Sequence, residues 1–270
     1  LSRRKPRSFS GRHVLITGGS EGIGLEIAKQ CAARGATVTL VARTRSKLDA
    51  ARASVLAATP SAKVGVQTAD VSQAAQVAQA VELGEKELGP VDVCIASAGI
   101  AIPKYFEELT QDDWAKMMSV NYFGVVHLAQ AVLPGMVSRG EGQFAAVSSM
   151  AAAVPFVGYA GYAPTKAACR SLMDVLRNEY CDTPLQFHVA FPPDTDTPGY
   201  EKAGHPHPPS PSTHPHPGPG PGPVSVPGHA WMALAPPISP TIIAPPRRRT
   251  RPSRGRRATC SPTRSTRPSR

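Results

Sequence analysis

Short apolar runs alternate with longer stretches of helical character along the first two hundred residues of this 270-residue chain. The short runs are rich in β-branched residues and typical of buried strands, and they fall at residues 13–17, 37–42, 64–69, 91–98, 144–148 and 187–191. Between them, helices are predicted over residues 23–34, 46–58, 73–88, 112–138 and 162–180. Apolar strands that alternate strictly with helices predict a parallel sheet covered on both faces, in a doubly wound α/β domain of Rossmann type.

The alternation stops near Tyr200, where the composition changes. Residues 201–270 hold 18 of the 29 prolines, and their 11 basic against 1 acidic residue supply +10 of the net charge of +11. Proline prevents regular helix and sheet, and this composition is typical of disorder. We therefore expect a basic N-terminal segment at residues 1–12, a nearly neutral folded domain at residues 13–199 and a disordered Pro/Arg-rich tail at residues 200–270.

Cysteine spacing and hydropathy exclude several classes of protein. The five cysteines are widely spaced and form no CxxC pair, so neither a disulfide framework nor a metal site is expected. No run of about 18 apolar residues is present, and we expect no membrane span in this chain.

A glycine-rich run, Gly18-Gly19-Ser20-Glu21-Gly22-Ile23-Gly24, lies between the first predicted strand and the first predicted helix. Gly18 permits a tight turn, Gly22 lets the backbone approach a pyrophosphate, and Gly24 lets the helix pack closely on the strand. The amides at the helix N-terminus favour an anion. In this context the run predicts a dinucleotide site.

The end of the second predicted strand indicates which dinucleotide is bound. An acidic residue there binds the ribose hydroxyls of NAD, whereas an Arg accommodates the 2′-phosphate of NADP. Arg43 and Lys47 occupy this position and no acid occurs before Asp49, which favours NADPH. Asp70 follows the third strand, where it could bind the adenine amine or cap the next helix.

Tyr162 and Lys166 have the spacing of one helical turn, and Ser149 lies thirteen residues before the tyrosine, where the fifth strand ends. An ammonium group one turn away and a cationic nicotinamide would both favour the phenolate form of a catalytic tyrosine. Tyr159 has Ala163 at the equivalent spacing, so only Tyr162 has the lysine partner.

The glycine run and the Ser, Tyr and Lys spacing together resemble the short-chain dehydrogenase/reductase family over residues 13–199. The resemblance implies that Ser149, Tyr162 and Lys166 are catalytic and that Asn121 holds a water in the proton relay. It implies a secondary substrate contact at Ser148. It also extends the cofactor contacts to Ser20, Glu21, Ile23, Val71, Gly99, Pro193, Tyr162 and Lys166. The usual Asn-x-Ala-Gly is replaced by Ala96-Ser97-Ala98-Gly99, which removes an amide that ties adjacent strands together.

The run Pro192-Pro193-Asp194-Thr195-Asp196-Thr197-Pro198-Gly199 is similar to that of the 3-ketodihydrosphingosine (3-dehydrosphinganine) reductases. This narrower resemblance implies reduction of a lipid-like ketone to sphinganine with NADPH, at the cytosolic face of the endoplasmic reticulum membrane. It also implies membrane association of the intact protein and allows a homo-oligomer.

Three alternatives remain open at this point. The first is a short-chain reductase for another lipid or small carbonyl. The second is nucleic-acid binding through the Arg-rich tail, which the scarcity of aromatic residues there makes the weaker alternative. The third is a non-catalytic product, because relatives continue with a substrate-side helix and a further strand where this chain has its proline tail. A shifted reading frame would give such a domain, truncated after the sixth strand.

Overall fold

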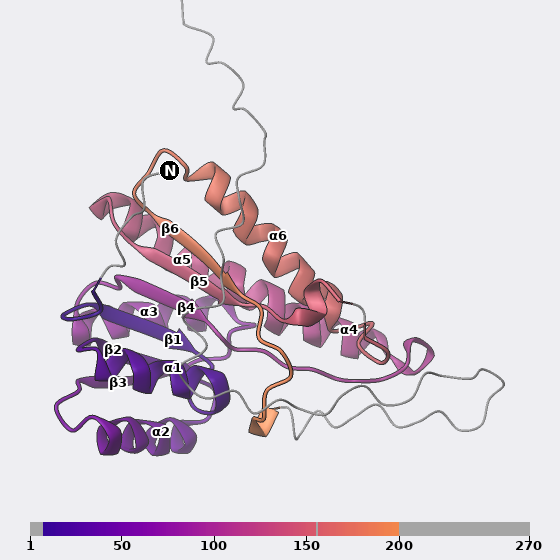
Figure 1. Ribbon diagram of the computed structural model, residues 1–270, viewed down its shortest axis with the longest axis horizontal. Coiled ribbons are helices and arrows are strands. Elements are labelled where there is room, and N and C mark those ends of the chain that lie inside the picture. Colours follow the sequence, from indigo (N-terminus) through magenta and orange to yellow (C-terminus); the bar gives the residue numbers. More distant parts are fainter. Residues whose placement is uncertain (1–7, 155, 200–270) are drawn as a thin grey trace, which may run out of the picture. The chain divides into compact units, whose positions relative to one another are not determined.

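The predicted parallel sheet is present in the computed structural model, which describes residues 8–154 and 156–199 (Figure 1). Its strand order is β3-β2-β1-β4-β5-β6, and all five pairings are parallel. The direction of winding reverses between β1 and β4, and ligands of such sheets bind outside the carboxyl ends of the strands at this point. The strands are β1 (His13–Thr17), β2 (Thr37–Ala42), β3 (Val64–Thr68), β4 (Val93–Ala96), β5 (Gln143–Val147) and β6 (Gln186–Ala190).

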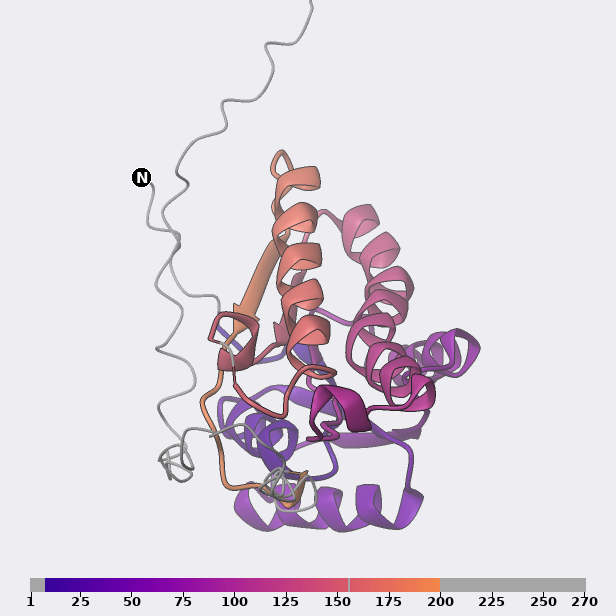
Figure 2. The same cartoon turned by 90° about the vertical axis from the view of Figure 1, so that its right-hand side faces the viewer.

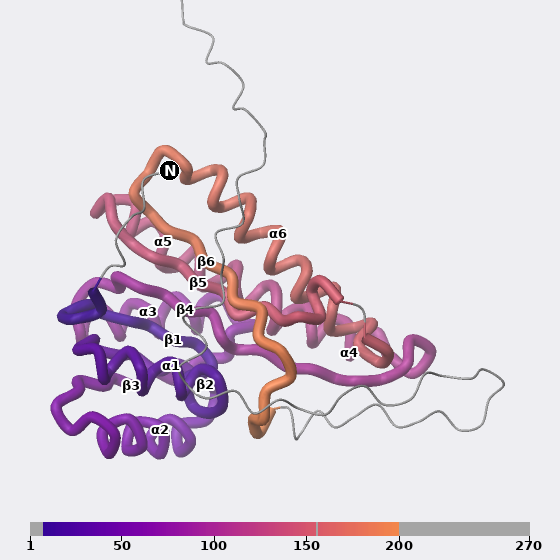
Figure 3. Tube along the Cα trace, viewed as in Figure 1, coloured from indigo at the N-terminus to yellow at the C-terminus, as the bar shows by residue number. Residues whose placement is uncertain are grey.

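Helices cover both faces of the sheet, as the strand pattern predicts (Figure 2). Helices α1 and α2 pack on one face, and α3, α5 and α6 pack on the other. The path of the chain between them is followed in Figure 3. The bounds are α1 (Gly22–Ala33), α2 (Arg45–Ala58), α3 (Ala74–Leu88), α4 (Gln111–Met118), α5 (Gly124–Arg139) and α6 (Ala163–Glu179), with short turns η1 (Phe106–Glu108), η2 (Ser119–Phe123) and η3 (Met150–Ala152).

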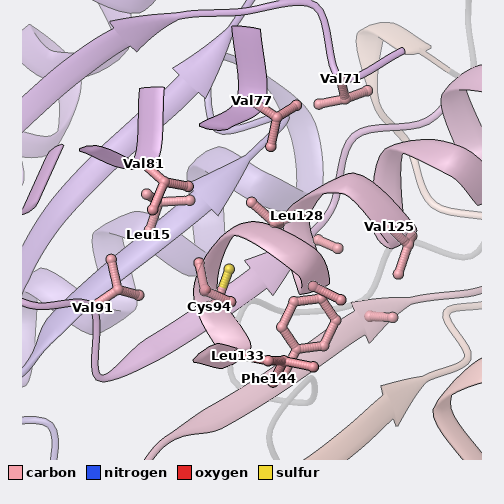
Figure 4. Packing of buried hydrophobic residues seen from close by; sticks show 14 of the residues in the cluster. Leu15, Val71, Val77, Val81, Val91, Cys94, Val125, Leu128, Leu133 and Phe144 are labelled. Carbon is pink, nitrogen blue, oxygen red and sulfur yellow. The ribbon is translucent and has the colours of Figure 1, made fainter. Parts of the chain in front are cut away.

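Neighbouring residues of β1 pack into different cores, because successive side chains of a strand point to opposite faces. Leu15 packs with α3 and α5, whereas Val14 and Ile16 pack with α1 and α2. Figure 4 shows the first of these cores, where Phe144 of β5 lies near Leu128 of α5. Because both faces of β1 are fully covered, all five of its residues are buried.

The predicted helix at residues 112–138 is continuous in the structure but contains one irregular turn. Helix α4 passes into one turn of π-helix, η2, before α5 begins. Thr110 and Asp113 form a reciprocal capping box at the start of α4. A π-helical turn places residues off the regular 3.6-residue period, which is common at functional sites.

By length and composition, the continuous helical stretch Gln111–Arg139 would suffice to cross a membrane, with a mean hydropathy of 1.3 in its apolar window. This criterion concerns length and composition alone, so the expectation of no membrane span in this chain stays a prediction. Half of the window is buried inside the fold, as in the core helix of a soluble protein.

The outer strand is less covered on the face that carries α1. His188 of β6 is exposed, and Ala145 and Val147 of β5 are only partly buried. The predicted strand at residues 91–98 is shorter in the structure, because residues 97–99 already belong to the loop that follows β4. The predicted disordered tail and the first seven residues of the predicted basic segment lie outside the described residues.

Candidate active site

The glycine-rich loop connects β1 to α1 and has the backbone shape that the sequence predicts. Gly18 has φ +68°, and its amide donates a hydrogen bond to the carbonyl of Val41, 2.8 Å away, which fastens the loop to β2. A Cβ on Gly18 would lie 2.8 Å from Cα of Ala98, and a Cβ on Gly24 would overlap the carbonyl oxygen of Gly18. Gly22 has φ +56°. The loop therefore requires glycine for its conformation and for its close packing.

The start of α1 is suited to an anion. Glu21 is the N-cap residue, but its side chain makes no capping hydrogen bond, and the first turn of α1 contains no acidic residue. The amides of Gly22, Ile23 and Gly24 therefore have no side-chain acceptor from the cap. An anionic pyrophosphate would satisfy these donors and interact favourably with the helix dipole, so the residues present fit a dinucleotide.

The basic residues after β2 differ in their partners. Arg43 is exposed, and within residues 8–154 and 156–199 no acidic side chain pairs with it. Arg45 is bound to Asp49 at 3.0 Å. The ammonium of Lys47 lies 2.7 Å from the carboxylate of Glu21, so this cation is held against the glycine loop. Arg43 is thus the cation best placed to bind a phosphate, and Lys47 adds positive charge next to the glycine loop.

Asp70 follows β3 and belongs to a turn rather than to a helix cap. Its carboxylate accepts hydrogen bonds from the amide and the hydroxyl of Ser72, at 2.9 and 2.7 Å. Helix α3 begins only at Ala74, with Gln73 as its N-cap residue. The helix-cap alternative is therefore excluded, and the adenine contact of Asp70 stays a prediction. Val71 is buried.

Tyr162 and Lys166 lie at the start of α6, with Tyr162 at the N-cap position. The ammonium of Lys166 lies 5.7 Å from the centre of the Tyr162 ring. Lys166 is only 4% exposed, and its ammonium donates a hydrogen bond to the carbonyl of Val147 at the end of β5, 3.0 Å away. Ser149 lies two residues after the end of β5 and is partly exposed, and its hydroxyl accepts a hydrogen bond from the amide of Ala151 at 3.1 Å.

Asn121 lies in the π-helical turn η2 and is completely buried. Its side chain binds both the amide and the carbonyl of Ile100, at 2.8 and 2.9 Å, and donates to the hydroxyl of Thr165 at 2.9 Å. Thr165 in turn donates to the carbonyl of Tyr162 at 2.7 Å. A Cβ on Gly99 would lie 3.2 Å from the Lys166 ammonium and 3.3 Å from Oδ1 of Asn121. Asn121 thus joins the loop after β4 to the catalytic helix.

Ser148 does not face the accessible site. It is 2% exposed, and its hydroxyl donates to the carbonyl of Lys166 at 2.9 Å. Adjacent residues at a strand end point in opposite directions, so Ser148 fastens α6 while Ser149 remains accessible. This geometry contradicts the expected substrate contact at Ser148.

The loop after β4 lacks the amide side chain usual in the resembled family, and Thr17 supplies a substitute. The hydroxyl of Thr17 accepts from the amides of Ser97 and Ala98, at 3.3 and 3.4 Å. The carbonyl of Thr17 also accepts from the amide of Ser97 at 3.2 Å. Thr17 is 2% exposed, so these bonds tie the end of β1 to the end of β4 inside the fold.

The segment after β6 returns across the sheet edge toward the glycine loop (Figure 1). A Cβ on Gly22 would lie 3.2 Å from Cβ of Thr197. Pro193 lies within this segment, and its carbonyl accepts from the hydroxyl of Thr195 at 2.8 Å. The carbonyl of Pro192 accepts from the amide of Met150 at 3.1 Å. Pro193 thus lies in the segment that returns to the glycine loop, and its cofactor contact stays a prediction.

Sequence reasoning missed four residues that shape the site: Thr17, Thr165, Cys169 and Thr197. Cys169 donates from its thiol to the carbonyl of Asn121 at 3.0 Å. Burial raises the pKa of this thiol, which keeps it protonated and able to donate. Of these four, only Thr165 and Cys169 could have been found from the sequence, because they lie close to Lys166 on the same helix. Thr165 is one residue before Lys166, and Cys169 is three residues after it.

Comparisons with known proteins agree with this geometry. The profile of the short chain dehydrogenase family matches residues 12–207. A 3-dehydrosphinganine reductase from Danio rerio is 40% identical over 199 residues, covering 73% of this chain and 60% of that protein. The chain therefore spans less than two thirds of the length of this relative.

Solved structures show the same architecture. The crystal structure of levodione reductase superposes with a TM-score of 0.70 and is 32% identical, with 72% of this chain and 76% of that chain covered. An actinorhodin polyketide ketoreductase with NADPH gives a TM-score of 0.69 and 26% identity, with 73% of this chain and 75% of that chain covered.

Proposed function

Because the chain belongs to the short-chain dehydrogenase family, we propose that it reduces a ketone with a nicotinamide cofactor at the site around Tyr162. The observation that carries this proposal is that buried Lys166 lies next to the ring of Tyr162 and binds the end of β5, two residues before accessible Ser149. We propose further that the cofactor is NADPH and that the ketone is 3-ketodihydrosphingosine, which yields sphinganine.

In the proposed reaction each residue has a distinct task. When bound, the reduced nicotinamide supplies the hydride that adds to the carbonyl carbon. Ser149 orients the carbonyl oxygen through its hydroxyl, and Tyr162 gives the proton that this oxygen takes up. Lys166 stabilises the phenolate that forms when Tyr162 donates its proton, because the Lys166 ammonium lies close to the ring. Asn121 and Thr165 fix the start of the helix that carries these groups.

Replacement of Tyr162 by Phe tests the catalytic assignment. The variant should lose turnover and keep most of its cofactor binding, because the glycine loop is unchanged. Tyr180→Phe is the matched control, since Tyr180 lies at the far end of α6, where its ring stacks on Phe187. Ketone reduction by Tyr162→Phe at the wild-type rate would exclude Tyr162 as the proton donor.

The choice of NADPH is supported by Arg43, which has no acidic partner among the described residues. Arg43→Ala should raise KM for NADPH about tenfold or more and leave KM for NADH nearly unchanged, as expected for loss of a charge-assisted bond to the phosphate. Arg45→Ala is the control, because Arg45 is paired with Asp49. Equal effects of Arg43→Ala on both cofactors would contradict the assignment.

The lipid substrate is supported by the reductase from Danio rerio and by the run that ends in Pro198-Gly199. The likeness to levodione reductase favours a second candidate, in which the ketone is small and cyclic. Cofactor oxidation with 3-ketodihydrosphingosine, levodione and simple ketones separates the two. Preference for the lipid by kcat/KM supports the first candidate, and preference for levodione supports the second.

We also propose that the protein works at the cytosolic face of the endoplasmic reticulum, where the resembled reductases act. The support is the proposed lipid substrate alone. Fractionation of cells that express the tagged chain, followed by protease treatment of sealed microsomes, tests this location. Recovery of the protein only in other fractions would contradict it.

A further inference from the structure

An apolar groove with a volume of about 410 Å³ lies beside the catalytic tyrosine. One wall is the turn η1 with the residue before it, and the other is the loop before α6 together with the first turn of that helix. The residues that line it are Tyr105, Phe106, Glu107, Phe156, Val157, Gly158, Tyr159, Ala160, Ala163 and Pro164.

The two walls are fastened to each other and to α4. The amide of Lys104 donates to the carbonyl of Gly158 at 2.9 Å. The ammonium of Lys104 binds Asp113 at 2.8 Å. This ammonium and the amide of Thr110 lower the pKa of Asp113 to about 2, so the ion pair persists at ordinary pH. The two walls of the groove are therefore fixed relative to each other by hydrogen bonds and an ion pair.

The lining suits a hydrocarbon and offers little to a polar ligand. Phe106 is 71% exposed, Val157 50% and Phe156 45%. Among the described lining residues Glu107 alone carries a charge. The backbone amide of Ala163 is bound to the carbonyl of Tyr159 at 2.8 Å, and Pro164 has no amide hydrogen. An exposed apolar surface of this kind marks a binding site for another apolar group.

A series of aromatic rings connects the groove to the catalytic residue. The ring of Phe156 lies 6.3 Å from that of Tyr159, and the ring of Tyr159 lies 5.8 Å from that of Tyr162, both edge to face. Tyr159 lines the groove. Tyr159 thus links the groove to the residue at which the ketone is proposed to bind.

We infer that this groove binds the alkyl chain of the ketone substrate and that Val157 and Phe156 set the preference for long chains. The inference rests on the proposed function and adds the place where the hydrocarbon lies. Each methylene buried contributes about 0.8 kcal/mol, which corresponds to roughly fourfold in kcat/KM.

A homologous series of 3-keto-2-amino alcohols with increasing chain length tests this. For the wild-type chain, kcat/KM should rise roughly fourfold per methylene over the lengths that fill the groove and then level off. Val157→Asp should lower kcat/KM tenfold or more for the long substrates and leave the shortest unchanged. Leu83→Asp is the matched control, because Leu83 is also an exposed apolar residue, at 41%, but lies on α3. A flat dependence on length, or equal losses for long and short substrates in Val157→Asp, would overturn the inference while leaving the reductase function intact.

A binding measurement makes the test independent of turnover. Trp114 stands edge to face against Phe106, with ring centres 5.9 Å apart, so its fluorescence reports on the groove. The sequence contains two tryptophans, and Trp231→Phe leaves Trp114 as the only reporter. Sphinganine should change this fluorescence in a saturable way, whereas 2-amino-1,3-propanediol, its headgroup without the chain, should not.

The outcomes separate the groove from the activity. Saturable binding of sphinganine, abolished by Val157→Asp but not by Leu83→Asp, supports the groove even if no ketone is reduced, which would refute the proposed function alone. No response to sphinganine, or an equal response to the headgroup, would refute the groove. A change of mass in size-exclusion chromatography with Val157→Asp, without any change in chain-length dependence, would assign this surface to a second copy of the chain and equally overturn the inference.

Discussion

Replacement of Thr165 by Val removes one hydroxyl from the centre of the site and keeps the shape of the side chain. Thr165 is 1% exposed, and its hydroxyl accepts from the amide of Asn121 while donating to the carbonyl of Tyr162. In the valine variant one hydrogen of the Asn121 amide loses its partner, and Asn121 is completely buried. A buried donor left without an acceptor costs about 1–3 kcal/mol.

The carbonyl of Tyr162 contributes little to this cost. It still accepts from the amides of Thr165 and Lys166, at 3.0 and 3.3 Å, after the hydroxyl is gone. We therefore expect a loss of about 2 kcal/mol in the free energy of unfolding, which lowers Tm by roughly 4–8 °C in a domain of this size. Turnover should fall as well, because Asn121 is no longer held against the helix that carries Tyr162.

Thr165→Ser is the matched control. Serine keeps the hydroxyl and loses only a methyl group, which costs about 1 kcal/mol. Thermal denaturation and steady-state kinetics should therefore rank the wild type first, Thr165→Ser second and Thr165→Val last. A valine variant as stable and as active as the serine variant would refute the view that this hydroxyl holds Asn121.

Three further predictions address the loop, the sheet and the serine pair. Gly24→Ala should abolish cofactor binding and lower Tm, because the new Cβ would overlap a backbone oxygen. Gly135→Ala inside α5 is the control and should raise the free energy of unfolding by about 0.5–1 kcal/mol. Equal effects of the two substitutions would contradict the packing argument. Burial lowers the pKa of His13, so the unfolded chain takes up its proton first as the pH falls. The contribution of His13 to the free energy of unfolding is therefore fully present above pH about 6.5 and declines below it. His13→Gln should flatten the dependence of Tm on pH between about pH 5 and 7. An unchanged dependence would show that His13 does not titrate there. Ser149→Ala should lose turnover and also about 1 kcal/mol, because the Ala151 amide loses its acceptor. Ser148→Ala should lose about 1 kcal/mol and keep turnover, and the reverse result for turnover would exchange the two roles.

Local sequence signals predicted the helices and strands but not the π-helical turn within one of the helices. Each predicted strand is found within two residues of its expected start, because a buried parallel strand is a continuous apolar run. The π-helical turn at residues 119–123 has no such signal. Asn121 lies in that turn and bonds to Ile100 and Thr165, which are 21 and 44 residues away, so no local pattern indicates it.

The same distinction separates the site residues that were predicted from those that were not. The glycine loop follows from spacing within one turn of chain, and its positive φ angles at Gly18 and Gly22 agree with that prediction. Spacing alone could not assign Ser148 and Ser149, since both are hydroxyls at the same strand end. The packing of Ser148 against α6 separates them. Thr17 and Thr197 were missed because their partners lie about 80 and 175 residues away.

The burial of Lys166 lowers stability in a way that its proposed catalytic role would explain. Its ammonium is bound to the carbonyl of Val147, and no carboxylate pairs with it among residues 8–154 and 156–199. The ammonium of a lysine that is 4% exposed and has no carboxylate partner loses hydration that one carbonyl does not restore. The fold tolerates this cost next to the ring of Tyr162, where a positive charge stabilises a phenolate. Every buried side-chain nitrogen and oxygen of residues 8–154 and 156–199 has a hydrogen-bond partner, so a lysine buried without a carboxylate is an exception that agrees with the proposed catalytic role.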